Sequence, residues 1–428
     1  MASAFSGGRV RIPHLAAALA ALACCASLAP DTSAQNQIKI GVLEPLSGPI
    51  AAEGRRQLNG MEIVRDLINE RGGIAGKQLV WVVGDVPDAT AATNEASRLI
   101  TQEGVKLIVG TFSSSLCLPA SDVAARNNIV YWEVSCVDPR FSVRGYKNVF
   151  RTEIDANGFG WYELEFIRDA LPKKLGKELK DIKLALLSED SAYGQGTTEA
   201  ARKRAQELGI PILSVDFYNR TAMTDFTPII LKLKAAQPDV IIANAYTNDA
   251  ILFWQQARQL DLNVKAVVSA GAIGSGSPDF GKSLGSTAEG PFSLLEPAGL
   301  NPRALAKQVA ELEAEIAKRY QARYNERYAA SAQLGAAGLW MLFEVLKKTG
   351  GDLSPEKVRA AALSLDIPVG GTLNGWGVKF QDNGQNAADR VQHYIVQWQD
   401  GKQVTVWPER FAVAPMRYVP LPKWSERK

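Results

Sequence analysis

Hydrophobic and polar positions follow two alternating periods along most of the chain. Residues 37–43 form a short run of apolar, largely β-branched residues, and residues 53–71 then place apolar side chains at helical spacing. Gly72 and Gly73 follow this stretch, and glycine is favoured just past a helix C-terminus. Strands that alternate with helices in this way are typical of βαβ units, so the sequence predicts a parallel sheet.

The alternation continues and restarts once, after residues 148–151. Predicted strands of the first series also cover residues 79–83, 106–109 and 129–134, with helices at 89–103 and 116–126. The second series predicts helices at 161–171, 193–208, 226–236 and 249–260, and strands at 182–187, 211–217, 240–243 and 264–269. Two series predict two doubly wound, Rossmann-like α/β lobes with a cleft between them. Ligands of such sheets bind beyond the carboxyl ends of the strands.

The C-terminal third has a different pattern. Residues 303–328 are predicted to form a long charged helix, and residues 332–346 are apolar nearly all round, which indicates a buried helix. Residues 394–398 and 404–407 flank Asp400-Gly401 and predict a β-hairpin.

The N-terminus carries the pattern of a processing signal. Arg9 and Arg11 precede an apolar run of about 15 residues, short of the roughly 20 that a membrane-spanning helix needs. Small residues end at Ala34, so residues 1–34 are interpreted as a cleaved signal peptide and the mature protein is expected in the periplasm. An alternative is a lipoprotein acylated at Cys24 or Cys25.

Composition narrows the class of protein. The 428 residues are 46% hydrophobic and 22% charged, with a formal net charge of +3. These values are ordinary for a globular protein of one large or two smaller domains, and they do not support a disordered or coiled-coil chain. No long basic run is present, which argues against a nucleic-acid partner.

Few residues remain for metal or thiol chemistry. Beyond residue 34 the chain keeps one histidine, His393, and two cysteines, Cys117 and Cys136. A zinc site built from histidine and cysteine needs three or four such ligands, so no metal site or cofactor is expected. In an oxidising compartment the two cysteines favour a disulfide, with two buried free thiols as the alternative.

Catalytic motifs are weak. Residues 276–283 match the phosphate-loop pattern GxxxxGK[ST], but the preceding predicted strand ends near Ser269 and Pro278 lacks an N–H donor, so this segment is interpreted as a surface loop. His393 has no GxSxG partner motif and is interpreted as structural. Glu189 and Asp190 end a predicted strand and could form a hydrolytic pair, although a solvated loop or helix cap is favoured.

Several motifs together resemble a known family. They are IKIGVLEPLSG at residues 38–48, NERGGI at 69–74, the serines at 113–115, NVFR at 148–151 and YGQG at 193–196. They look like the periplasmic solute-binding proteins of branched-chain amino acid (Leu/Ile/Val-binding) ABC importers, over residues of about 38 to 407. The resemblance implies a type I periplasmic binding fold, or Venus flytrap, with two lobes joined by a three-segment hinge. It also implies no catalysis, a membrane permease as partner, and a monomer.

The resemblance also suggests lobe boundaries. Residues 35–153 and 292–386 are expected to form the N-terminal lobe, and residues 154–291 and 387–428 the C-terminal lobe.

Ligand-binding positions can be carried over from this resemblance. Ser114 and Ser115 match the place where the family holds a ligand carboxylate, and a helix N-terminus is independently suited to an anion. Ser135 and Cys136 match the next strand end, which completes that site. Tyr193 and Tyr246 match aromatic positions of the second lobe that close over the ligand.

The chain departs from the family at positions that bear on the substrate. Val137 replaces a threonine, and no acid stands near Ala270-Gly271, where amino-acid binders place a glutamate for the ammonium group. Because an unpaired buried ammonium is costly, recognition of an α-amino acid is doubtful. Glu53 stands where an aromatic is common, and Glu133, after Trp132, could substitute electrostatically. A Cys117–Cys136 disulfide would lie beside this pocket and join two of its loops.

These observations predict the substrate-binding subunit of an importer for a small solute that carries a carboxylate, such as an amino acid or a related organic acid. A ligand-sensing domain of a receptor is an alternative within the same fold. A less favoured alternative is an exported hydrolase that uses Glu189, Asp190 or Glu133.

Overall fold

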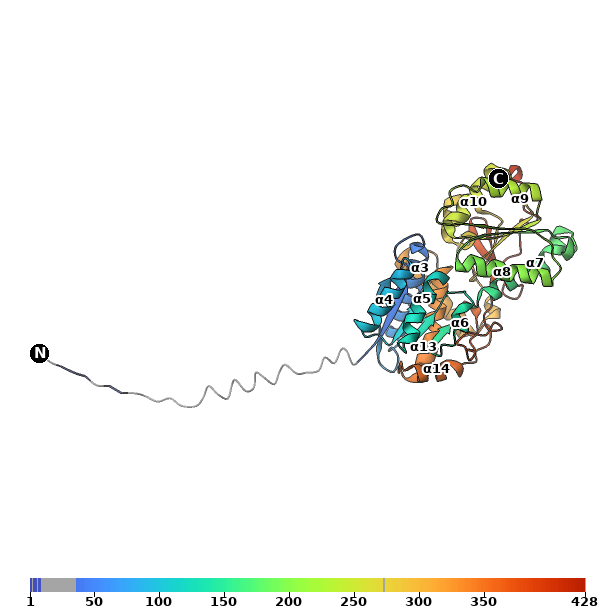
Figure 1. Ribbon diagram of the computed structural model, residues 1–428. Coiled ribbons are helices and arrows are strands. Elements are labelled where there is room, and N and C mark those ends of the chain that lie inside the picture. Colours follow the sequence, from blue (N-terminus) through green and yellow to red (C-terminus); the bar gives the residue numbers. More distant parts are fainter. Residues whose placement is uncertain (2, 6, 9–35, 272–273, 428) are drawn as a thin grey trace. The chain divides into compact units, whose positions relative to one another are not determined.

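A computed structural model describes residues 1, 3–5, 7–8, 36–271 and 274–427 (Figure 1). The chain divides into two compact units, residues 1–37 and 38–428, and the second unit holds the folded body. The predicted cleavage site after Ala34 and the possible lipid-bearing residues Cys24 and Cys25 lie outside the described residues.

The first sheet has five strands in the order β2-β1-β3-β4-β5. β1 pairs in parallel with β3, β3 with β4, and β4 with β5, as the alternating pattern predicts. Helices α3, α4 and α5 connect its strands, and a short helix, α6, precedes the last strand. The bounds are β1 Gln37–Glu44, α3 Ala51–Glu70, β2 Gln78–Asp85, α4 Ala89–Thr101, β3 Leu107–Gly110, α5 Ser114–Arg126, β4 Val130–Glu133, α6 Arg140–Val143 and β5 Val149–Arg151.

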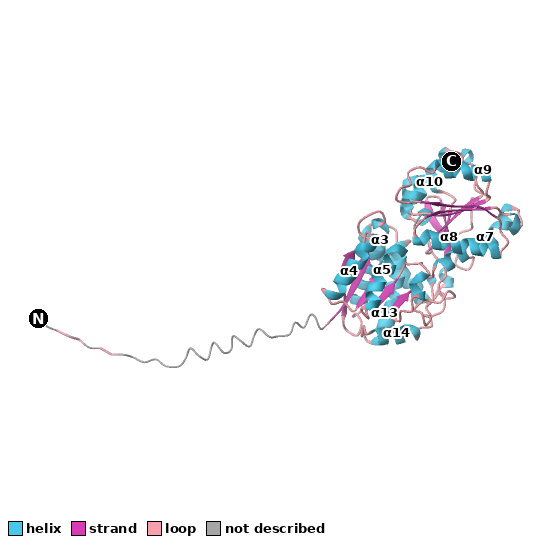
Figure 2. Cartoon of the chain, viewed as in Figure 1, coloured by secondary structure: helices cyan, strands magenta, loops and turns pink. Residues whose placement is uncertain are grey.

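The second sheet has seven strands in the order β12-β11-β10-β9-β8-β6-β7. Its β6–β10 strands are parallel, and the predicted C-terminal hairpin adds two antiparallel strands. Helices α7 and α8 lie on one side of this sheet, and α9 and α10 on the other (Figures 1 and 2). The bounds are α7 Ala156–Leu175, β6 Leu184–Glu189, α8 Ala192–Glu207, β7 Ile212–Tyr218, α9 Thr227–Ala236, β8 Val240–Asn244, α10 Thr247–Gln259, β9 Ala266–Ala270, α11 Pro278–Leu284, β10 Phe292–Leu295, β11 Tyr394–Gln399 and β12 Lys402–Trp407.

Three helices between β10 and β11 return to the first sheet. They are α12 Lys307–Tyr324, α13 Ser331–Thr349 and α14 Pro355–Leu363. α13 packs closely on α3, because a Cβ added to Gly60 would lie 1.9 Å from the backbone oxygen of Ala332. The apolar helix predicted at residues 332–346 is therefore buried, as expected. Single 3-10 turns lie at Leu179–Asp181, Gly274–Gly276, Gly285–Ala288, Pro302–Ala304, Leu373–Gly375 and Trp424–Glu426.

The chain thus passes between the two sheets three times: after β5, after β10 and before β11. The strand β10 pairs with β9 in the second sheet, although the expected boundary assigns residues from 292 to the N-terminal lobe. Three of its residues, 292–294, pair in register with residues 268–270, which places β10 in the C-terminal half. The rest of the lobe division stays a prediction.

Residues 276–283, which match the phosphate-loop pattern, were expected to form a surface loop, but most of them form a short helix. Ser277 caps α11 with its side chain, so most of residues 276–283 are helical, and Phe280 is buried. A Cβ on Gly281 would lie 2.2 Å from the Trp398 ring, which leaves no space there for a phosphate group.

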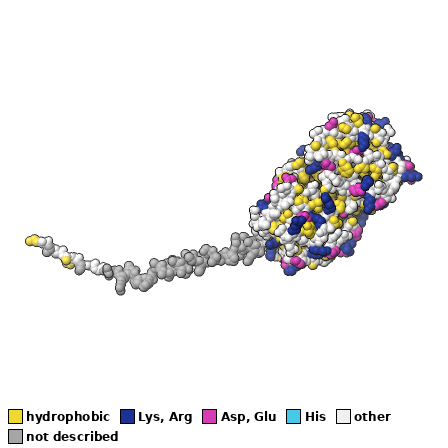
Figure 3. Space-filling view, viewed as in Figure 1, with side chains coloured by type: hydrophobic (Ala, Val, Ile, Leu, Met, Phe, Trp, Pro, Cys, Tyr) yellow, Lys and Arg dark blue, Asp and Glu magenta, His cyan; other side chains and the backbone are white. Residues whose placement is uncertain are grey.

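The described residues include no helix with both the length and the apolar character needed to cross a membrane. On the face shown in Figure 3, basic and acidic side chains are interspersed.

Candidate functional site

A cavity lies where the carboxyl ends of strands from both sheets meet. It encloses about 430 Å³ of empty space, part of it open to solvent. The lining residues follow β3, β4, β5, β6, β8, β9 and β10 in the chain, which is the strand edge where α/β sheets bind ligands. They are Phe112, Ser113, Ser114, Ser135, Val137, Glu153, Phe159, Tyr193, Tyr246, Gly271, Glu296 and Leu334.

One wall of this cavity is the start of α5. Ser114 is the first residue of that helix and is buried, and its Oγ accepts a hydrogen bond from the Val137 N–H at 3.3 Å. The first N–H groups of a helix have no partner within the helix, and they carry the positive end of its dipole. Ser135 lies opposite and donates its hydroxyl to the Thr111 carbonyl at 3.0 Å. This arrangement suits a carboxylate.

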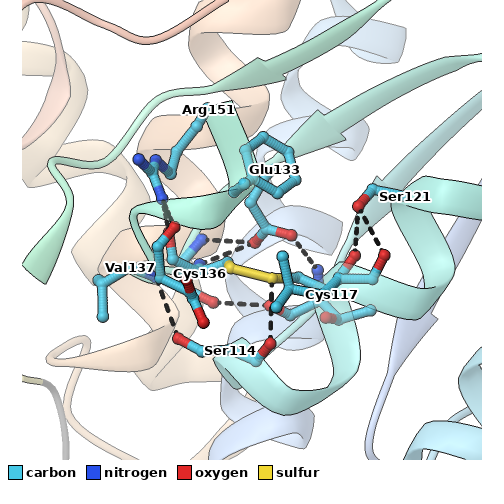
Figure 4. The surroundings of a disulfide bond; sticks show 12 residues. Ser114, Cys117, Ser121, Glu133, Cys136, Val137 and Arg151 are labelled. Carbon is cyan, nitrogen blue, oxygen red and sulfur yellow. Dashed lines mark hydrogen bonds between the residues drawn. A yellow bond between two sulfur atoms is a disulfide. The ribbon is translucent and has the colours of Figure 1, made fainter. Parts of the chain in front are cut away.

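Two buried acids beneath the cavity hold its turns in place. Glu133 accepts backbone N–H groups from Thr111 at 3.0 Å and from each of residues 134–136 at 2.9 Å (Figure 4). Glu44 accepts the N–H of Phe112 at 3.1 Å. Burial raises the pKa of Glu133 to about 7, although its four N–H donors favour the charged form. Glu133 thus positions the serine turns and does not line the cavity.

Cys117 and Cys136 are joined by a disulfide bond between α5 and the turn after β4 (Figure 4). Both cysteines are fully buried. The bond connects the helix that begins at Ser114 with the turn that carries Ser135, so the two serine-bearing segments are covalently linked beside the cavity. Cys136 itself is not among the lining residues.

Two tyrosines line the cavity from the second sheet. Tyr193 lies in the first turn of α8, after β6, and Tyr246 precedes α10, after β8. The Tyr193 hydroxyl donates to the Ala270 carbonyl at 2.5 Å, and the two rings meet edge to face at 5.9 Å. The Arg220 guanidinium lies 4.1 Å from the Tyr246 ring centre. Burial raises the pKa of Tyr246 to about 12, so its hydroxyl stays protonated at neutral pH.

Glu53 lies in a neighbouring, larger hollow. It is buried and accepts a hydrogen bond from the Thr247 hydroxyl at 2.7 Å, which joins α3 to α10. This hollow of about 990 Å³ also includes Arg220, Asp249 and Asp279. Tyr246 lines both spaces.

Other candidate residues from the sequence lie outside the cavity. Ser115 is exposed on the first turn of α5. Glu189 is buried and accepts hydrogen bonds from the backbone of Ser191 and Gly194, so it organises the start of α8. Asp190 is exposed. A hydrolytic pair is therefore not assembled, because the Glu189 carboxylate is engaged by its own helix.

The sequence analysis missed two acids that line the cavity. Glu153 follows β5 and Glu296 directly follows β10, and both are buried. Each stands just past the end of a strand, which is the signal that identified Ser114. Val137 and Gly271 line the cavity as expected, so the family's polar groups are missing there, but carboxylates enter it from these other positions.

Comparisons with known proteins agree with this architecture. The family described as "Periplasmic binding protein" matches residues 37–403. The Leu/Ile/Val-binding protein homolog 7 of Brucella suis is 34% identical over 405 residues, which cover 93% of this chain and 98% of that protein. Homolog 8 of the same strain is 32% identical, with 93% and 97% covered.

Solved structures share the fold. LivJ from Streptococcus pneumoniae, in complex with isoleucine, has a TM-score of 0.72 at 20% identity, and covers 87% of this chain and 100% of its own. A solute-binding protein of an ABC transporter from R. palustris, in complex with benzoate, has a TM-score of 0.71 at 18% identity, with 89% and 97% covered. Proteins of this family bind substrates outside the cytoplasm for ABC transporters and are not enzymes. This chain belongs to that family, as a type I periplasmic binding protein of the branched-chain amino acid type.

Proposed function

We propose that this protein is the substrate-binding subunit of an ABC importer that captures a small carboxylate-bearing solute and delivers it to a membrane permease. The observation that carries the proposal is the cavity between the start of α5 and the two tyrosines. Ser114 offers its hydroxyl and the N–H groups of the helix start to an anion, Ser135 lines the cavity beside it, and Tyr193 and Tyr246 present rings from the second sheet.

The ligands of similar proteins support the choice of a carboxylate. LivJ holds isoleucine, and two Rhodopseudomonas proteins hold benzoate and 3,4-dihydroxybenzoic acid. All three molecules carry a carboxyl group, although one is an aliphatic amino acid and two are aromatic acids. Val137 and Gly271 offer no charged partner to an ammonium group, whereas Glu153 and Glu296 line the same cavity, so the test compares organic acids directly with α-amino acids.

Delivery of the solute to the permease is explained by a cavity that residues of both lobes line. A solute that contacts both lobes has a higher affinity for the closed arrangement, and it shifts the population toward that form. The closed form would then be the one that docks on the permease. In this proposal the signal peptide of residues 1–34 directs a monomer to the periplasm.

Thermal unfolding of residues 35–428 with a panel of solutes tests the proposal. The panel compares aliphatic and aromatic carboxylates, keto acids, amino acids, amides and alcohols. A ligand at 100 times its dissociation constant stabilises the protein by about 2.7 kcal/mol, which gives a measurable shift of the unfolding temperature. Shifts with carboxylates and none with the matched amides are expected.

Three variants locate the site by calorimetry with the best carboxylate. Ser114→Ala should weaken binding by a factor of roughly 10 to 150, the equivalent of about 1.5–3 kcal/mol for a hydrogen bond to a charged group. Tyr246→Ala should weaken it as well. Ser115→Ala is the matched control on the same helix turn, since Ser115 is exposed, and it should bind normally.

Two results would contradict the proposal. Equal affinity in Ser114→Ala and in Ser115→Ala would remove the helix start from the site. A solute that binds but is not transported by a reconstituted permease would favour the receptor alternative.

A further inference from the structure

Each of the three passages between the sheets contributes one titratable side chain to a single buried cluster. Glu153 follows β5, Glu296 follows β10, and His393 precedes β11. Their exposed fractions are 1%, 2% and 1%. We call these three residues the hinge cluster. Two of its members, Glu153 and Glu296, also line the solute cavity.

The polar atoms of the hinge cluster are close together, and four of them lack hydrogen-bond partners among the described residues, whereas Glu153 Oε1 accepts the Ile154 N–H at 2.7 Å. One ligand atom from each side chain lies within 4.8 Å of the other two, and His393 Nε2 is 3.1 Å from Glu153 Oε1. Within the described part of the chain, Glu153 Oε2, Glu296 Oε2 and both ring nitrogens of His393 have no hydrogen-bond partner. Buried polar atoms without partners are costly, so the arrangement calls for a bound group.

The charge of the hinge cluster defines that group. No lysine or arginine of the described residues forms an ion pair with Glu153 or Glu296. The buried Arg151 guanidinium donates instead to Gln385, to backbone carbonyls and to Ser142. The hinge cluster therefore presents two carboxyl groups and one imidazole, with no basic side chain in the described part of the structure paired to them, which is a donor set of oxygen and nitrogen atoms suited to a divalent cation.

We infer that the hinge cluster is a binding site for a divalent transition-metal ion, with zinc as the best fit. Carboxylate oxygens and an imidazole nitrogen bind zinc at about 2.0–2.2 Å. Ligand atoms at that radius lie roughly 3.3 Å apart in a tetrahedron, so small side-chain rotations bring the three atoms into place. Three protein ligands leave one position open, and the solute cavity borders the two glutamates.

The surroundings of His393 support ligation. Its ring lies 4.9 Å from that of Phe159 and 5.5 Å from that of Tyr162, and it stacks at 5.8 Å on Trp376. These aromatic rings hold the imidazole plane and exclude water from the metal's inner side. An ion bound here would link all three passages of the chain and neutralise the acids that face the solute.

A second group of potential ligands does not qualify. Cys117, Glu133 and Cys136 also lie close together. Their two thiols form the disulfide, and the Glu133 oxygens already accept four backbone N–H groups. No atom of that group is free to bind an ion.

Titration of the untagged, chelator-treated protein with Co²⁺ tests the inference. Cobalt takes zinc-like sites and reports its coordination through visible absorption bands. We expect saturation at one ion per chain, displacement of the bands by Zn²⁺, and a zinc-dependent rise in unfolding temperature. Glu296→Gln and His393→Gln should each weaken binding by at least about tenfold.

Glu163→Gln is the matched control. Glu163 is also fully buried with both oxygens unpartnered, but it lies on α7 outside the hinge cluster, and its variant should bind cobalt normally. Circular dichroism establishes that each variant is folded, and Glu153→Gln replaces any that is not.

Three outcomes would overturn the inference. One is the absence of saturable cobalt binding at millimolar concentration, and another is equal binding in Glu296→Gln and the control. The third is binding of leucine only to metal-free protein, which would assign the hinge cluster to a solute ammonium group. None of these outcomes depends on whether the importer proposal holds.

Discussion

Glu133→Gln is the most direct test of how the serine turns are held. The substitution keeps the size of the side chain and removes its titration. One carboxylate oxygen accepts the N–H groups of residues 134–136, and the other accepts that of Thr111. In the variant one oxygen is replaced by an amide N–H₂, which cannot accept these hydrogen bonds. Depending on its orientation, either the Thr111 N–H or the N–H groups of residues 134–136 lose their acceptor.

The magnitude has two parts. Losing a hydrogen bond to a buried charged acceptor costs about 1.5–3 kcal/mol, and this part applies wherever the wild-type carboxylate is ionised. The second part depends on pH, because burial raises the pKa of Glu133 from 4.5 to about 7. Such a group binds its proton more tightly in the folded state. Its stabilising contribution to the free energy of unfolding is complete below pH 4.5. It is lost as the pH rises through about 7, a change of about 3 kcal/mol.

Urea unfolding at pH 5, 6, 7 and 8, followed by tryptophan fluorescence, measures both parts. The wild-type protein should lose about 2.5 kcal/mol relative to Glu133→Gln between pH 5 and pH 8, because part of the contribution is already lost at pH 5. The exposed Glu199→Gln serves as a control and should run parallel to the wild type. A difference between wild type and Glu133→Gln that is the same at all four pH values would refute the assigned pKa and its cause.

Three further predictions concern the covalent link, the helix packing and the contact between lobes. Reduction of the disulfide should lower the free energy of unfolding by about 3 kcal/mol, as expected for its short loop, and urea unfolding with and without dithiothreitol measures this. Gly60→Ala should cost about 1–3 kcal/mol in the same assay, because its Cβ meets the α13 backbone at 1.9 Å, whereas Gly196→Ala meets side-chain atoms no closer than 3.2 Å and should be nearly neutral. Arg56→Met removes a 2.8 Å ion pair between α3 and α11, and calorimetry should show a several-fold weaker affinity for the solute.

The sequence predicted the long elements well because their periods are clear over many residues. The short strands β5 and β10, Val149–Arg151 and Phe292–Leu295, were not predicted. Each follows only a short helix, α6 or α11, so the strand–helix alternation that marked the equally short β3 and β4 is interrupted there. β10 is recognised only through its pairing with β9 and β11, which are distant in sequence. The misplaced lobe boundary at residue 292 has the same cause.

Part of the cavity lining could be predicted from one rule, that ligand-binding residues of α/β sheets come just after the strands. Ser114, Ser135, Tyr193 and Tyr246 all follow strands, and the cavity brings them together, while their contact with a solute remains a prediction. Glu133 satisfies the same rule and lies elsewhere, because its partners are backbone N–H groups of two turns 22 residues apart. Hydrogen bonds from backbone N–H groups to a side chain cannot be recognised from the sequence, because every residue except proline has a backbone N–H.

The contacts between α3 and the second half of the chain bear on how tightly a solute binds. Arg56 pairs with Asp279, and Glu53 accepts the Thr247 hydroxyl in a buried position, so the protein itself stabilises the arrangement in which both walls of the cavity meet. The apparent dissociation constant equals the intrinsic value divided by the fraction of protein in that arrangement. Neither contact involves a cavity-lining residue. If the proposed site is correct, affinity and specificity are set separately: the contacts of α3 set the fraction of closed protein, and the serine turns and tyrosines select the solute.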